Sequence, residues 1–184
     1  MNEALNDTST GNLDDPYTWR QDIWYKVIGP DFVNVAFSAA QAAVQANNLS
    51  VKLYYNDYSI ESPGNKSTAA QALVKRLKDA NIQIDGAGLQ SHFIVGSTPS
   101  LADQVANMKA FAALGVEVAI TELDIRTTVP ATEAAQLQQV KDYNTSVSAC
   151  REVSECVGVT IWDFDDEYSW VSPFVPARAM FYMC

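Results

Sequence analysis

The sequence predicts an α/β fold in which parallel strands alternate with helices. Short apolar runs rich in β-branched residues alternate with longer segments of helical periodicity, and a few residues separate one from the next. Polar and aromatic residues gather where each expected strand ends. Strands of this kind have both faces covered, which leaves two usual architectures: an open doubly wound sheet or a (β/α)8 barrel.

The composition sets the class of protein. The chain has 184 residues, 48% hydrophobic and 18% charged, which excludes a disordered protein and indicates one domain with a core. Its net charge of −10 argues against binding a nucleic-acid backbone or an anionic membrane surface. No apolar run approaches the roughly 18 residues of a membrane span. The first ten residues show no signal peptide.

Four helices are expected from apolar stripes and capping residues. Ser67 is a plausible N-cap of the expected helix 67–80. Ser100 is a plausible N-cap of the expected helix 100–114, which Gly115 would stop. Small apolar residues form the stripe of the first helix. The expected helices are Val35–Ala46, Ser67–Ala80, Ser100–Leu114 and Thr132–Val153.

Four strands are expected between these helices, at Val51–Tyr55, Ile84–Gln90, Val116–Leu123 and Val157–Trp162. Asn56 and Asp57 are expected to stop the first. No G-x-G-x-x-G follows a strand, so the dinucleotide-binding sheet lacks its signature. A complete barrel needs about 200 residues at the least, so four strands indicate either a smaller fold or part of a barrel.

Two facing carboxylates, one protonated and one ionised, can cleave a glycosidic bond. Glu122 follows the apolar run VAIT, where a strand leaves the core, and Asn2-Glu3 offers a second acid. Each is also typical of a plain solvated carboxylate. His92, the only histidine, is either a structural residue or an imidazole that orients Glu122, with Asp124 as a second acceptor.

Trp162 and Trp170 are candidates for stacking against sugar rings, with ordinary core packing as the alternative. The acidic stretch from Asp163 to Glu167 lacks the spaced ligands and the glycine of a calcium loop. We therefore expect neither a metal nor a cofactor.

Cys150 and Cys156 lie six residues apart, which allows a disulfide across a short loop or two free thiols, and Cys184 is expected to be unpaired. Four N-x-S/T sequons are present, at Asn6, Asn48, Asn65 and Asn144. The cysteine pair and these sequons together favour a secreted protein, whose chain would be mature or truncated.

Taken in order, these segments resemble the family 10 glycoside hydrolases, the retaining endo-β-1,4-xylanases. NEALND (2–7) resembles the family's strand-4 motif, and TWRQDIWYKVIGPDFV (18–33) resembles the helical segment that follows it. Four further segments of this chain resemble strands 5 to 8 of the family and the loops that follow them: KLYYNDYSIE, DGAGLQSHF, ITELDIR and CVGVTIWDFDDEYSW. NEALND, YYNDY and ITELD in this order are highly specific.

The resemblance implies a partial (β/α)8 TIM barrel, with strands 5 to 8 and a remnant of strand 4. Residues 1–184 would be the C-terminal part of a single glycoside hydrolase catalytic domain. It also implies a Cys150–Cys156 disulfide, which is common in fungal members, and xylan or xylo-oligosaccharides as substrate.

The resemblance also implies roles for site residues. Glu3 would be the general acid/base and Glu122 the nucleophile. Asn2, Gln90 and His92 would hold the sugar and the nucleophile. Tyr58 would face the leaving group, and the walls of the site would be Trp162 and Trp170.

The sequence departs from the family pattern at Asp163, where Gly is usual, and at Ser59, where Asn is common. Strands 1 to 3 have no counterpart. We therefore expect little or no xylanase activity from these 184 residues alone, a loosely held Glu3, and self-association through exposed strand edges. The alternatives are an inert half-barrel, or another Asn-Glu/Glu barrel glycosidase such as a cellulase or mannanase.

Overall fold

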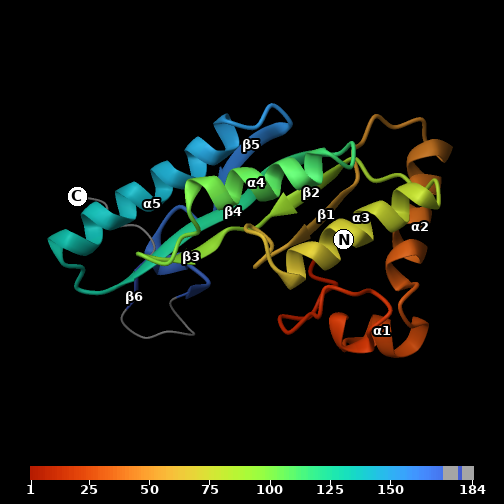
Figure 1. Cartoon of the computed structure of the whole chain (residues 1–184), viewed down its shortest axis with the longest axis horizontal. Helices are drawn as coiled ribbons and strands as arrows, with labels where there is room; N and C mark the ends of the chain where they lie inside the picture. Colours follow the sequence, from red (N-terminus) through yellow and green to blue (C-terminus); the bar gives the residue numbers. More distant parts are fainter. Residues whose placement is uncertain (172–177, 180–184) are drawn as a thin grey trace.

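The computed structural model describes residues 1–171 and 178–179. Helices and strands alternate along most of the chain, as expected, although two short strands follow one another directly at Gly86–Leu89 and His92–Ile94 (Figure 1). The helices are α1 (Ile23–Ile28), α2 (Phe32–Ala46), α3 (Asn65–Asp79), α4 (Leu101–Ala112) and α5 (Glu133–Arg151), with short 3-10 turns η1 (Pro16–Thr18) and η2 (Asp166–Tyr168). The strands are β1 (Tyr54–Asp57), β2 (Gly86–Leu89), β3 (His92–Ile94), β4 (Glu117–Thr128), β5 (Cys156–Ile161) and β6 (Arg178–Ala179).

Four strands form a parallel sheet in the order β1-β2-β4-β5. The short β3 runs parallel to the second half of β4, and β6 pairs antiparallel with the end of β4. Ahead of β1, Asn2 makes a parallel bridge to Asn56, where a remnant of a preceding strand was expected. This is the partial (β/α)8 barrel predicted from the sequence.

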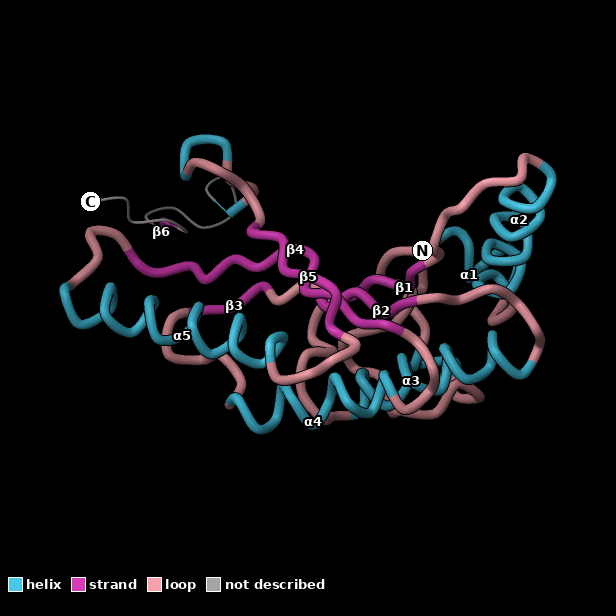
Figure 2. The backbone as a smooth tube through the Cα atoms, turned by 90° about the horizontal axis from the view of Figure 1, so that it is seen from above, coloured by secondary structure: helices cyan, strands magenta, loops and turns pink. Residues whose placement is uncertain are grey.

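Helices α3, α4 and α5 lie on one side of the sheet (Figure 2). Apolar residues of these helices join the buried core, including Leu73 and Leu77 of α3 and Phe111 of α4. Every residue of β2 is buried. The sheet edge is less covered: in the described part of the chain β5 pairs only with β4, and Val157 is 57% exposed.

Several boundaries differ from the sequence prediction. Strand β1 begins and ends later than expected, so Asn56 and Asp57 belong to it instead of stopping it. Pairing with Gly88 and Leu89 of β2 satisfies their backbone, which overrides their low strand propensity. Strand β4 continues to Thr128, five residues beyond the expected end, because β3 and β6 pair with its second half.

The helix caps were predicted with mixed success. Ser100 caps α4 as expected, accepting a hydrogen bond from the Asp103 N–H. Ser67 is not an N-cap, because α3 begins at Asn65 and the Ser67 hydroxyl donates to Asn107 Oδ1 of α4 instead. Helix α4 ends at Ala112, and Gly115 lies beyond it with φ +74°.

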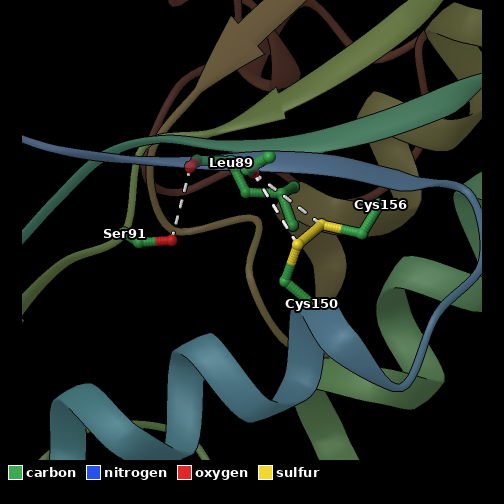
Figure 3. Close-up of a disulfide and its surroundings, with 5 residues drawn as sticks. Leu89, Ser91, Cys150 and Cys156 are labelled. Carbon is green, nitrogen blue, oxygen red and sulfur yellow. Dashed lines mark hydrogen bonds between the residues drawn. A yellow bond between two sulfur atoms is a disulfide. The ribbon is translucent and has the colours of Figure 1, made fainter.

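The Cys150–Cys156 disulfide is present and joins the end of α5 to the start of β5 (Figure 3). The two Cα atoms are 5.2 Å apart, within the usual range. Cys184 lies outside the described residues. Across residues 1–171 and 178–179, no helix has both the length and the apolar character needed to cross a membrane.

Candidate active site

The carboxyl ends of parallel strands meet at one edge of the sheet, and most of the predicted site residues lie there. They surround a cleft of about 570 Å³. The cleft is lined by Glu3, Tyr58, Ser59, Gln90, His92, Glu122, Arg126, Trp162 and Trp170. Asn2 and Asp124, also predicted, contact these residues without lining the cleft themselves.

A network of amide side chains joins the two predicted carboxylates. Asn56 Nδ2 donates to Asn2 Oδ1 and to Glu122 Oε1, each at 2.8 Å. Gln90 Nε2 donates to Asn2 Oδ1 at 3.1 Å and to Glu3 Oε1 at 3.0 Å. The hydroxyl of Thr121 donates to Asn56 Oδ1 at 2.6 Å, which fixes the orientation of that amide. Glu3 and Glu122 are therefore held relative to one another through Asn2, Gln90 and Asn56.

Glu3 is more firmly held than its position at the third residue suggested. Its N–H donates to the Asn56 carbonyl at 2.8 Å, which ties it to β1. Its Oε2 accepts from Arg20 Nη1 at 2.8 Å, and its Oε1 accepts from Gln90 and from Asn2 Nδ2. Both carboxylate oxygens thus have partners, contrary to our expectation of a loosely held acid.

Glu122 lies within β4 and faces the only histidine. The nearest approach is 3.3 Å, between Glu122 Oε2 and His92 Nε2. On its other side, His92 Nδ1 is 2.5 Å from Asp124 Oδ2, which also accepts from Trp170 Nε1 at 2.9 Å. Burial alone would lower the pKa of His92, but its hydrogen bond with the fully buried Asp124 and the two carboxylates raise it overall. The charged form of the imidazole is therefore more stable here than in a free histidine.

Tyr58 also lines the cleft, and two cationic side chains contact it. Arg20 Nη2 donates to its hydroxyl at 3.1 Å, and the ammonium of Lys66 lies over its ring, 3.6 Å from the centroid. Burial and the neighbouring Asp7 raise the pKa of Tyr58 to about 12, so the hydroxyl stays protonated at neutral pH. Lys66 in turn pairs with the buried Asp57 at 3.0 Å.

The two tryptophans border the cleft instead of filling the core. Trp162 and Trp170 are 39% and 38% exposed. Trp170 packs its ring edge against His92, with centroids 4.9 Å apart. Such half-exposed aromatic faces suit the apolar faces of sugar rings. Within the described residues no group of three or more His, Cys, Asp or Glu side chains is placed to hold a metal ion.

Sequence reasoning missed Arg20, Asn56 and Arg126 as site residues. The sequence did hold a signal for Asn56, because this residue lies in the polar cluster at the end of the expected strand Val51–Tyr55. Arg20 lies 17 residues from Glu3 in an irregular segment, so no periodicity connects the two. Arg126 lies in the part of β4 that was expected to be a loop.

A parallel sheet whose carboxyl edge gathers two carboxylates, their amide partners and exposed tryptophans is the arrangement typical of one class of protein, the glycoside hydrolases built on a (β/α)8 barrel. Comparison with known families agrees. The family model for glycosyl hydrolase family 10 matches residues 1–183, and the chain belongs to this family.

The most similar relatives include fungal xylanases. The chain is 54% identical to endo-1,4-beta-xylanase D of Talaromyces funiculosus over 171 residues, which is 93% of this chain and 39% of that protein. It is 47% identical to endo-1,4-beta-xylanase C of Phanerodontia chrysosporium, over 93% of this chain and 40% of that protein. The chain therefore spans about two fifths of the length of these relatives.

Solved structures are similar over nearly the whole chain. A family 10 xylanase from Bispora sp. MEY-1, solved with xylobiose, superposes with a TM-score of 0.90 at 50% identity. The Penicillium canescens endo-1,4-beta-xylanase XylE gives 0.89 at 48% identity. In both cases the match covers 97% of this chain and 52% of the other, as a partial barrel requires.

Proposed function

We propose that residues 1–184 are the C-terminal part of a single catalytic domain that hydrolyses internal β-1,4-xylosidic bonds in xylan with retention of configuration. The observation that carries this proposal is the arrangement of Glu3 and Glu122 at one cleft, joined through Asn2, Gln90 and Asn56. The names of the relatives support the substrate class, and xylobiose is bound in the Bispora enzyme.

The reaction is a double displacement. A Glu122 carboxylate oxygen attacks the anomeric carbon and forms a covalent glycosyl ester, while Glu3 gives its proton to the departing glycosidic oxygen. Glu3, now ionised, then takes a proton from water. As the proton leaves, the water oxygen attacks the same carbon, breaks the ester bond and regenerates the Glu122 carboxylate.

The neighbouring residues orient these two groups. His92, held by Asp124, directs its Nε2 at Glu122 Oε2 and limits rotation of the nucleophile. Asn56 donates to the other oxygen of Glu122. The remaining oxygen lone pairs are free to reach the sugar.

The cleft walls bind the substrate. Asn2 and Gln90 offer amide groups to the hydroxyls of the sugar at the cleavage site, beside the two carboxylates. Trp162 and Trp170 offer apolar faces to the ring, and Tyr58 faces the leaving group. These partners orient the substrate and preorganise the charges around the reacting carbon, which is the larger part of such catalysis.

The experiment is a chimera that joins this chain to the preceding part of the Talaromyces funiculosus enzyme. We expect xylan hydrolysis with retained anomeric configuration by NMR, and labelling of Glu122 by a 2-fluoro-xylobioside in a peptide map. E122Q and E3Q should each lower kcat by several orders of magnitude, while Q45A on the outer helix α2 serves as the control. An inactive chimera that folds would favour the inert half-barrel, and a label on another residue would refute Glu122 as the nucleophile.

Substrate choice is tested on the same chimera. Xylan should be hydrolysed in clear preference to mannan and carboxymethylcellulose. Equal or faster hydrolysis of either competitor would point to a cellulase or mannanase. The 184-residue chain assayed alone should show little or no turnover, since it corresponds to about half of the related barrel structures.

We also propose a secreted location, which the disulfide supports because such bridges persist in oxidising compartments. Expression of the chain behind a fungal secretion signal should give a bridged Cys150–Cys156 in an unreduced peptide map. Alkylation of both thiols in secreted material would contradict a structural Cys150–Cys156 bridge.

A further inference from the structure

Glu61 is a buried acid to which the proposed reaction gives no task. It lies in the loop between β1 and α3 and is only 4% exposed. Its Oε1 accepts a hydrogen bond from the backbone N–H of Ser91 at 2.8 Å. Burial raises the pKa of Glu61, and the N–H groups and His92 oppose this. Burying a carboxyl group costs free energy unless it is hydrogen-bonded, so the bond to the Ser91 N–H is the contact that this burial depends on.

Ser91 is the residue between two side chains of the cleft, Gln90 and His92. It is 1% exposed and has a left-handed backbone with φ +68°, a conformation that is strained for a serine. This turn lets the chain pass from β2 to β3, which pair with different parts of β4. The direction of both neighbouring side chains depends on this one strained residue.

The rest of the turn is tied to the strands on either side. The Gln90 N–H donates to the Asp57 carbonyl of β1 at 3.0 Å. The carbonyls of Gln90 and Ser91 accept from the N–H groups of Glu122 and Asp124 of β4, at 3.1 and 3.3 Å. Glu61 adds the tie on the Ser91 N–H, so the turn is fixed by β1, by β4 and by the loop between β1 and α3.

We propose that Glu61 is a positioning residue, which holds the Gln90–Ser91–His92 turn in its left-handed conformation and thereby aims Gln90 at Glu3 and His92 at Glu122. It acts through Ser91 and does not touch the cleft. The catalytic roles of the aligned side chains rest on the proposed function. The alignment itself rests on the contacts described above.

Two substitutions separate the reach of Glu61 from its charge. Glu61→Gln keeps a carbonyl oxygen at the same distance from Ser91 but removes the charge. Glu61→Asp keeps the charge but withdraws the oxygen by one methylene. Glu117→Asp is the matched control, because it shortens a glutamate at the opposite end of β4, beside Lys52 and Tyr54.

The first readout needs no activity, because His92 is the only histidine and its ring signals can be followed by NMR across pH in the 184-residue chain. The groups facing His92 are Glu122 and Asp124 of β4 and Glu61 of the loop. We expect Glu61→Asp to bring the His92 titration toward its ordinary value although the charge remains. Glu61→Gln should change it less, and Glu117→Asp should leave it unchanged.

Three outcomes of this titration overturn the proposal. A larger shift for Glu61→Gln than for Glu61→Asp would mean that Glu61 acts by charge alone. Equal shifts in Glu61→Asp and Glu117→Asp, or no shift in either Glu61 variant, would mean that Glu61 has an ordinary structural role.

The second readout uses the active chimera. Glu61→Asp should lower kcat by about tenfold or more with little change in KM, since small displacements of reacting groups are costly. Glu61→Gln should recover most of that loss. If the unsubstituted chimera does not hydrolyse xylan, the proposed function fails, whereas the His92 titration still decides the role of Glu61.

Discussion

The buried ion pair between Lys66 and Asp57 supports the wall of the cleft, and replacing Lys66 by methionine should cost much of the stability of the fold. The Asp57 side chain is fully buried, and that of Lys66 is 4% exposed. Methionine keeps the length and apolar stem of lysine but removes the ammonium, which leaves the Asp57 carboxylate in the core without its counter-ion.

The expected loss follows from these contacts. Breaking a buried pair by removing one partner costs about 3–5 kcal/mol. Asp57 keeps hydrogen bonds from the Tyr55 hydroxyl and from the Tyr58 N–H, so we expect the lower end, about 3 kcal/mol. For a chain of this size that corresponds to a fall of about 6–12 °C in melting temperature. Loss of the ammonium above the Tyr58 ring acts in the same direction.

The loss should depend on pH. Burial raises the pKa of Asp57, although Lys66 and the hydrogen bonds oppose this. A raised folded-state pKa means that the folded protein binds this proton more tightly than the unfolded chain, so stability falls as pH rises through that window. Without Lys66 the pKa of Asp57 rises further. The penalty of Lys66→Met should therefore be smaller at pH 4.5 than at pH 7.

The assay is urea unfolding followed by circular dichroism at both pH values. Lys75→Met is the matched control, because Lys75 lies on the same helix and pairs with Asp79 at the surface, where such pairs contribute about 0.5 kcal/mol or less. If Lys66→Met and Lys75→Met differ by under about 1 kcal/mol, or if the Lys66→Met penalty grows toward acid pH, the reasoning about a buried counter-ion is refuted.

Four further predictions concern separate parts of the chain. Replacing Cys150 and Cys156 by serine should lower the free energy of unfolding by about 2 kcal/mol, because the bridge closes a short loop; urea unfolding with and without the bridge measures this. The pKa of His92 is raised in the folded state, so protonated His92 should stabilise the fold fully below its ordinary pKa, and this stabilisation should disappear as pH rises through the folded-state pKa. The difference in unfolding free energy between wild type and His92→Gln, measured in urea, should therefore shrink from pH 5.5 to pH 9. A difference that stays constant with pH would contradict this prediction. Ser100→Ala removes the N-cap of α4 and should cost about 1 kcal/mol by thermal unfolding, with no loss indicating that the cap is dispensable. Self-association of the 184-residue chain through its exposed strand edge should be seen by light scattering and should decrease in Val157→Lys, whereas a monomeric wild type would rule it out.

Much of the fold could be predicted because local pattern and tertiary structure agree. The four strands of the parallel sheet and helices α2 to α5 all appear near their expected positions, and the cleft gathers the predicted residues. The supporting residues could not be predicted in this way. Arg20, Glu61 and Lys66 are charged residues in segments that read as surface, and their partners are 17, 30 and 9 residues away in the chain. Only the folded arrangement identifies them.

Backbone conformation shows where local preference and function conflict. Ser59, Ser91 and Asp163 each lie two residues beyond the end of a strand that borders the cleft, and all have positive φ, as does Glu3. Serine and glutamate gain nothing locally from a left-handed backbone, so no pattern of residue types signals these turns. The conformation persists because tertiary hydrogen bonds impose it: Glu61 on Ser91, and the Asn56 carbonyl on the N–H of Glu3. At Asp163 the family's usual glycine would adopt φ +63° without strain, so this chain keeps the turn at a cost that glycine avoids. Strain concentrated at the strand ends indicates that the directions of these side chains, more than local stability, determine the loops around the cleft.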